Sequence, residues 1–180
     1  MEETISAPEG VNASVEGYKV KVSGKLGSLE RDFYNRGTAS FIKLDKTPEG
    51  IKITGKKDSK EVKAVVGAIC AHIKSMFKGV TEGYKYSLKI HYVHFPMTVE
   101  QKGNEFFIKN FIGQKGLKKL KIPEGVKVQI NKQDVTITGI DKEKVGQAAA
   151  NFEIASKFVR NDKRRFQDGI YIVEKAAPMK

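Results

Sequence analysis

The sequence predicts an α+β protein made of two tandem duplicated domains, each a small antiparallel β-sheet with one packed α-helix. The chain has 180 residues, 39% of them hydrophobic, which suffices for one domain or for two of about 90 residues. Short strings recur in the same order in the two halves, and each half shows alternating stretches followed by a helical pattern. We place the first domain at residues 1–83, an inter-domain strand at residues 84–93 and the second domain at residues 94–180.

The internal repeat is carried by three pairs of strings. The string PEGV at residues 8–11 returns at residues 123–126, and PEGI at residues 48–51 is a third copy. IKITG at residues 51–55 corresponds to VTITG at residues 135–139, and GKLG at residues 24–27 corresponds to NFIG at residues 110–113. A unit of this length that occurs about twice is too long for a solenoid repeat and indicates a duplicated domain.

Strands are predicted where apolar and polar residues alternate. Tyr18, Val20 and Val22 alternate with polar residues, and residues 126–130 and 135–138 do likewise. The string NKQD at residues 131–134 forms a hairpin turn between the last two stretches. Residues 84–93 form a long strand that leads into the second domain, and residues 170–173 form a final strand that returns to the second sheet.

Each predicted helix follows a set of strands. In the first, residues 59–76, apolar residues recur three and four positions apart, and Asp58 is placed to cap the free amides with Glu61 as its reciprocal partner. The second begins after Asp141. Its expected buried residues are Val145, Ala148, Ala149 and Phe152.

The chain is strongly basic, with a net charge of +12 and a pI near 9.6. The surplus is +5 in residues 1–93 and +7 in residues 94–180. Five lysines and no acid lie within residues 109–121, and five basic residues accompany the single Asp162 within residues 157–165. A charge run can be a solvated face, but two dense clusters in a chain this basic favour a surface that binds a polyanion.

Several classes of protein are excluded. The single Cys70 rules out a disulfide framework and points to a reducing compartment. No apolar run approaches the roughly 20 residues of a membrane span, and the acidic start is unlike a signal peptide, so we expect no membrane partner. The three histidines are not clustered, and no nucleophile or acid–base pair is evident. We expect no catalytic residue, no metal and no cofactor.

Two fragments imitate nucleotide-binding motifs. GIKITGKK at residues 50–57 is one residue short of a P-loop, and NKQD matches a guanine-reading pattern. A P-loop must be a loop, whereas residues 51–54 alternate as a strand does, and Lys57 replaces the hydroxyl that would hold magnesium. A small GTP-binding enzyme is therefore the third-ranked hypothesis.

Lysine and arginine neutralise phosphate, and glycines let a backbone approach it closely. We therefore expect the RNA surface on loops at one edge of the second sheet. Asp168 is expected to form a turn or to orient a neighbouring arginine. Phe166 is expected to anchor its loop in the core, with stacking on an unpaired base as the alternative. The predicted RNA-binding residues are Gly113, Lys115, Gly116, Lys118, Lys119, Lys121, Lys157, Arg160, Lys163, Arg164, Arg165 and Gly169.

Two runs of sequence resemble a known family. DKRRFQDGIYIVEK at residues 162–175 resembles the C-terminal signature of the large ribosomal subunit protein six family (universal "L-six"), archaeal and eukaryotic branch. KGVTEGYKYSLKIHYVHFPMTV at residues 78–99 resembles the inter-domain strand of that family. The resemblance covers essentially the whole chain, and the absence of a basic eukaryotic insertion favours the archaeal branch.

The resemblance implies a structural protein of the cytoplasmic ribosome that binds large-subunit rRNA. Its second domain would dock near the sarcin–ricin loop and the factor-binding centre, with ribosomal proteins at the stalk base and translation factors as further expected partners. Ile154 and Asn161 stand where the family more often has a glutamine and a basic residue, so neither is assigned to RNA contact. The alternative is a non-ribosomal nucleic-acid-binding module, which would need a groove-reading helix, whereas both predicted helices are committed to packing.

Overall fold

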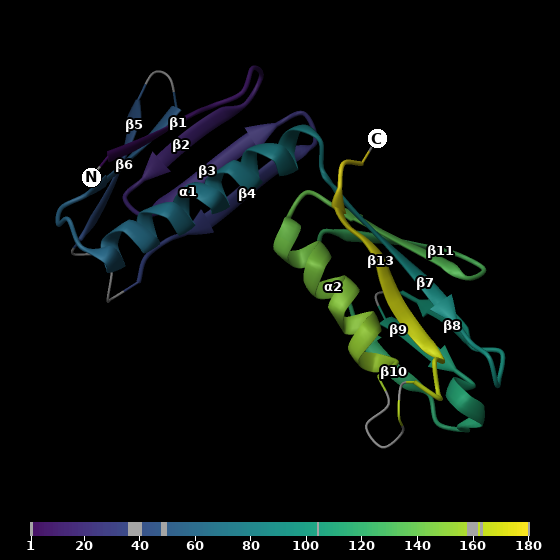
Figure 1. Cartoon of the computed structure of the whole chain (residues 1–180). Helices are drawn as coiled ribbons and strands as arrows, with labels where there is room; N and C mark the ends of the chain where they lie inside the picture. The colour runs from purple at the N-terminus through teal and green to yellow at the C-terminus, as the bar shows by residue number, and fades with distance from the viewer. Residues whose placement is uncertain are drawn as a thin grey trace. The chain divides into compact units, whose positions relative to one another are not determined.

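The computed structural model describes residues 2–35, 41–47, 50–103, 105–157, 162 and 164–179. The chain divides into two compact units, Met1–Gly83 (unit 1) and Tyr84–Lys180 (unit 2), and each is described by itself. Figure 1 shows the strands and the single long helix of each unit. No helix among the described residues is long and apolar enough to cross a membrane.

Unit 1 contains two three-stranded antiparallel sheets and the helix α1, Lys60–Thr81. Alternate residues of both sheets are buried against α1, such as Val22 in one sheet and Ile53 in the other, each with 0% of its surface exposed. The first sheet has the order β1 (Glu2–Ser6), β6 (Gly50–Gly55), β5 (Ile42–Thr47), and the second has the order β2 (Asn12–Glu16), β3 (Lys19–Gly24), β4 (Gly27–Asp32).

Unit 2 follows the same plan around the helix α2, Lys142–Ala155. Its core joins both sheets to α2, and the rings of Phe106 and Phe152 meet edge to face with centroids 5.4 Å apart. One sheet has the order β11 (Val126–Asn131), β12 (Asp134–Gly139), β7 (Tyr84–His91), β13 (Gly169–Ala177), and the other has the order β10 (Lys118–Lys121), β9 (Glu105–Lys109), β8 (Thr98–Lys102).

The two units repeat one another strand for strand. The pairing β1-β6-β5 returns as β7-β12-β11, and β2-β3-β4 returns as β8-β9-β10, each set being followed by its helix. The predicted tandem duplication of an α+β domain is confirmed. Each unit, however, has two sheets where we expected one, because alternation along a strand does not say with which strand it pairs.

The final strand β13 has no counterpart among the described residues of unit 1. It pairs antiparallel with β7 on the side of β7 that faces away from β12. Residues 84–93, which we expected to form an inter-domain strand, contribute β7, and β7 lies between β12 and β13 inside the sheet of unit 2.

The helix predictions differ in accuracy. Asp141 caps α2 by accepting a hydrogen bond from the Glu143 amide, and the four expected residues are its buried ones, as predicted. The cap of α1, however, is Ser59 and not Asp58: the Ser59 hydroxyl accepts from the Val62 amide at 3.3 Å. Asp58 instead pairs with Lys63 at 2.9 Å.

The end of α1 was predicted five residues too early. The helix continues from Met76 to Thr81 because Phe77 and Val80 extend its buried stripe, and the chain leaves the helix at Gly83, which has a φ of +68°. Glycine adopts this left-handed conformation without a steric penalty.

The two nucleotide-motif fragments lie in regular hairpins. GIKIT at residues 50–54 is part of β6, so its amides pair with β1 and β5 and cannot surround a phosphate. NKQD forms the predicted hairpin turn between β11 and β12, with Lys132 at a φ of +53°.

Candidate nucleic-acid interface

Two connections are long in unit 2. Strands β3 and β4 are joined by Lys25 and Leu26 alone, whereas the equivalent strands β9 and β10 are joined by residues 110–117, the first basic loop. Glu82 and Gly83 alone connect α1 to β7, the first strand of unit 2, whereas residues 156–168, the second basic loop, lie between α2 and the additional strand β13. Because unit 1 makes the first of these connections with two residues, the topology does not require the extra length there, whereas the second leads to β13 and has no equivalent within unit 1. Long loops on a rigid scaffold commonly carry function.

Both basic loops are bound to a third segment, residues 92–97, which connects β7 to β8 and is called the bridge. On one side, Asp168 Oδ1 accepts from the amides of Val93 and His94 at 2.9 and 3.1 Å, and His94 Nδ1 lies 2.7 Å from Asp168 Oδ2. On the other side, the Asn110 side-chain amide donates to the Pro96 carbonyl at 2.9 Å. The bridge therefore holds the two basic loops together at one end of unit 2 (Figure 1).

Asp168 is a buried carboxylate, with 5% of its surface exposed. Burial alone would raise its pKa, but hydrogen bonds from the His94 ring and from two backbone amides outweigh burial and lower the pKa to about 2. The group therefore stays ionised at neutral pH. We expected Asp168 to form a turn or to orient an arginine, whereas it binds His94 and the backbone of the bridge.

The first basic loop is fixed by its own backbone and by one core anchor. Asn110, Ile112 and Gly113 all have left-handed backbone conformations, with φ of 55°, 49° and 69°. This conformation is costly for β-branched Ile112, and such strain persists only where the surrounding structure enforces it. Phe111 supplies that enforcement, since it is 1% exposed in the core of unit 2.

Four of the predicted cations have free charges. Their side chains are exposed and make no ion pair with any residue that the structure describes. Lys115 lies in the first basic loop and Arg165 in the second, Lys157 directly follows the end of α2, and Lys121 is the last residue of β10. These are Lys115, Lys121, Lys157 and Arg165.

Three other predicted cations are already engaged. The Lys119 ammonium pairs with Glu105 at 2.6 Å. The Lys118 ammonium lies 4.0 Å from the ring centroid of Phe111, and burial lowers its pKa. Arg164 binds the Asp162 carboxylate through Nε and Nη2, although its side chain is 91% exposed.

Some predicted sites are placed differently from our expectation. Lys118, Lys119 and Lys121 lie on strand β10 and not in a loop. Gly169 is buried as the first residue of β13, opposite His91. Gly116 is exposed, and a Cβ there would meet open space. Arg160, Lys163 and the departure at Asn161 lie outside the described residues.

Comparison with known proteins identifies the family. The family model described as "Ribosomal protein L6" matches residues 7–83 and 95–169, so it covers most of both units in two segments. The chain belongs to the ribosomal protein L6 family. Curated relatives named large ribosomal subunit protein uL6 include those of Aeropyrum pernix and Sulfurisphaera tokodaii, at 47% and 46% identity over 96% of this chain and 93% and 91% of theirs.

A further relative of the same name, from Methanospirillum hungatei, is 39% identical over 98% of both chains. These relatives fit the archaeal branch. The L6 family is a structural component of the ribosome and not an enzyme.

Sequence reasoning missed the bridge of this L6-family chain. Val93 and Phe95 are 65% and 47% exposed, and the His94 side chain is 40% exposed. The bridge carries no cluster of charge, so a search for basic residues passes over it. The available signal was an aromatic residue before Pro96, directly after the end of an alternating strand.

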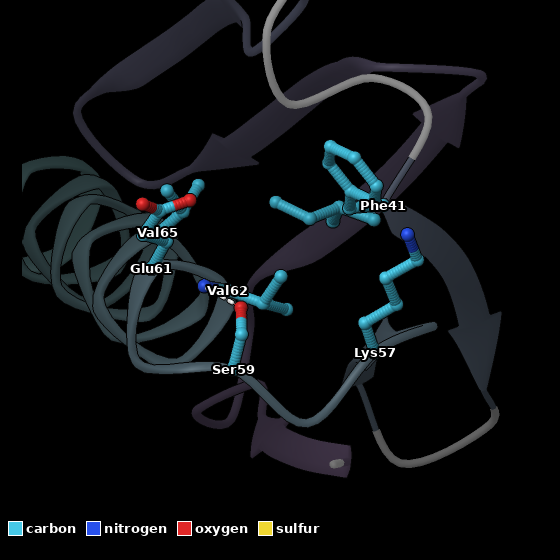
Figure 2. Close-up of a pocket in the computed structure, with 7 residues that line it drawn as sticks. Phe41, Lys57, Ser59, Glu61, Val62 and Val65 are labelled. Atoms are coloured by element: carbon cyan, nitrogen blue, oxygen red, sulfur yellow. Dashed lines mark hydrogen bonds between the residues drawn. The ribbon is translucent and has the colours of Figure 1, made fainter.

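The pocket drawn in Figure 2 lies in unit 1 and does not have the properties of a ligand site. It holds about 220 Å³, below the usual range for small-molecule sites, and its lining includes Val62 and Val65. Two of its polar groups are used locally. The Ser59 hydroxyl caps α1, and the Lys57 ammonium lies 5.0 Å from the ring centroid of Phe41.

Cys70 is a core residue of unit 1. Burial first, and then a hydrogen bond from its thiol to Glu3 Oε2 at 2.8 Å, raise its pKa to about 12, so it remains a thiol and not a nucleophilic thiolate. Within the described part of the chain, no group of His, Cys, Asp and Glu side chains could hold a metal ion.

Proposed function

We propose that this chain is a structural constituent of the large ribosomal subunit and binds large-subunit rRNA through the basic loops of unit 2. The RNA site lies near the sarcin–ricin loop and the factor-binding centre, as the family resemblance implies. The neighbouring partners are ribosomal proteins near the base of the stalk, with translation factors as further partners, and the place of action is the cytoplasmic ribosome.

One observation carries the proposal. The two long basic connections of unit 2 are both hydrogen-bonded to the bridge, and Lys115 in the first and Arg165 in the second are exposed and make no ion pair among the described residues. Phosphate contacts supply much of the affinity for a nucleic acid, and their cations must not be neutralised internally. Helix α2 buries its apolar residues in the core, so the loops and not a groove-reading helix present the charge.

The test measures binding of the full chain to an rRNA fragment that contains the sarcin–ricin stem-loop, over a series of salt concentrations. The double variant Lys115→Gln/Arg165→Gln should lower the slope of log affinity against log salt by roughly one to two units, since each phosphate contact contributes about 0.7 to 0.9. The control variant is Lys56→Gln/Lys57→Gln, which removes two exposed charges from unit 1. If the two double variants had equal slopes of log affinity against log salt, the assignment of RNA binding to unit 2 would be contradicted.

Location is tested separately from affinity. Crosslinking of the chain to rRNA in assembled subunits, read out by nucleotide, should place unit 2 beside the sarcin–ricin loop. A chain that washes off the large subunit in a high-salt gradient would instead be a non-ribosomal nucleic-acid-binding module.

A further inference from the structure

We propose that Phe95 of the bridge is a stacking platform for an unpaired RNA base that lies between the phosphate contacts of the two basic loops. This inference rests on the proposed function and adds to it a site for a nucleobase. Aromatic side chains that stack on unpaired bases are a general means of binding single-stranded RNA.

Phe95 is rigidly presented. The residue before it is held through its amide and its ring by Asp168, and the Asn110 side chain holds the carbonyl of the residue after it. The ring itself lies against Gly113, where an added Cβ would come within 3.4 Å of two ring carbons. A platform held in place in this way loses little conformational entropy when a ligand binds.

Phe95 is also more exposed than an aromatic residue that serves only to stabilise the fold. Phe95 is 47% exposed, and Val93 in the same segment and Leu117 in the first basic loop are 65% and 58% exposed. Single exposed apolar residues are ordinary, but these belong to two segments that the Asn110–Pro96 hydrogen bond joins. Exposed apolar side chains on two segments that are joined in this way favour a contact surface.

The surrounding charge favours a nucleobase over an apolar protein surface as the ligand of Phe95. The two acidic side chains described in the second basic loop are both engaged, Asp162 with Arg164 and Asp168 with the bridge. Lys115 and Arg165, which are exposed and make no ion pair among the described residues, lie in the two loops that are hydrogen-bonded to the bridge on either side of Phe95. A half-exposed aromatic residue held between two loops that carry unpaired cations is complementary to a base attached to its phosphates, and less so to an apolar protein surface.

The first test compares substitutions that separate stacking from apolar contact. Phe95→Ala and Phe95→Leu should both weaken binding of the full chain to the sarcin–ricin rRNA fragment, by roughly 5- to 100-fold for alanine. Phe95→Tyr should retain affinity because it keeps an aromatic face. The salt slope should stay at the wild-type value in all three variants, since no phosphate contact is removed.

The second test uses the absence of tryptophan from the sequence. In Phe95→Trp the single indole should be quenched when the rRNA fragment binds, because an indole stacked on a base loses fluorescence. The matched control is Tyr34→Trp in unit 1, an aromatic position that is 58% exposed. Its fluorescence should change little.

The outcomes separate this inference from the proposed function. If the Lys115/Arg165 variant loses salt slope while Phe95→Ala binds as the wild type does, the platform is refuted and the rRNA contact stands. If Phe95→Leu binds as tightly as the wild type while Phe95→Ala does not, the ring makes an apolar contact, as with a protein partner, and the platform is again refuted. If the wild-type chain has no affinity for the fragment, both proposals fall.

Discussion

Replacement of Asp168 by asparagine should destabilise unit 2 by about 2 kcal/mol at neutral pH. The pKa of this buried carboxyl falls from 3.8 to about 2 in the folded chain, and each pKa unit corresponds to about 1.4 kcal/mol. Asparagine keeps an oxygen for the amides of Val93 and His94 but loses the negative charge that faces the His94 ring. The loss is therefore that of the charge and not of the whole hydrogen-bond cluster.

The effect has a defined pH dependence. Because the folded pKa lies below the unfolded one, the carboxylate stabilises unit 2 fully above about pH 4. This contribution is lost as the pH falls through the folded pKa of about 2. The stability difference between the wild type and Asp168→Asn should shrink over the same interval.

Urea denaturation at a series of pH values, followed by methyl NMR, measures this difference for each unit. Ile108 and Ile137, both fully buried, report on unit 2, and Ile53 reports on unit 1 as an internal control that should not change. A variant as stable as the wild type at pH 7 would refute the reasoning, as would a difference that stays constant down to pH 2.

Three further predictions concern the caps, the packing and the second basic loop. Ser59→Ala should cost about 1 kcal/mol in urea denaturation because it removes the cap of α1, whereas Asp58→Ala should change little because the ion pair of Asp58 is exposed. Gly139→Ala should cost about 1–3 kcal/mol, because a Cβ would lie 2.7 Å from Val145 Cγ2, and Gly116→Ala, in open space, is its neutral control. Arg164→Gln should lower the salt slope of RNA binding less than Arg165→Gln does, because Asp162 already binds the Arg164 guanidinium, and equal slopes would contradict this order.

The sequence was sufficient for properties that depend on neighbours along the chain. Periodicity predicted β3, β6, the β11–β12 hairpin and the buried face of α2, because alternate positions on a strand and every third or fourth position on a helix share a face. It predicted α1 with the wrong cap, since Asp58 and Ser59 are both good capping residues and only the backbone geometry decides between them.

Properties that depend on contacts distant in sequence were not predictable. The partition of each unit into two sheets depends on which hairpins pair. The hydrogen bond from the Val93 amide to the Asp168 carboxylate joins residues that are 75 positions apart in the sequence. The basic clusters could be recognised from the composition of the two loops. That Lys118, Lys119 and Arg164 already have partners could be recognised only in the structure, which shows the side chains that they contact.

The duplication explains how unit 2 comes to present two basic loops that unit 1 lacks among its described residues. Strand β13, the element without a described counterpart, pairs with β7 in a register that places Gly169 opposite His91. This register places Asp168, the residue before the strand, within reach of Val93 at the start of the bridge. One added strand therefore does more than widen a sheet. It fixes the second basic loop to the bridge, while Asn110 fixes the first, and the charges of both loops are presented at one end of a fold that is otherwise common to both units.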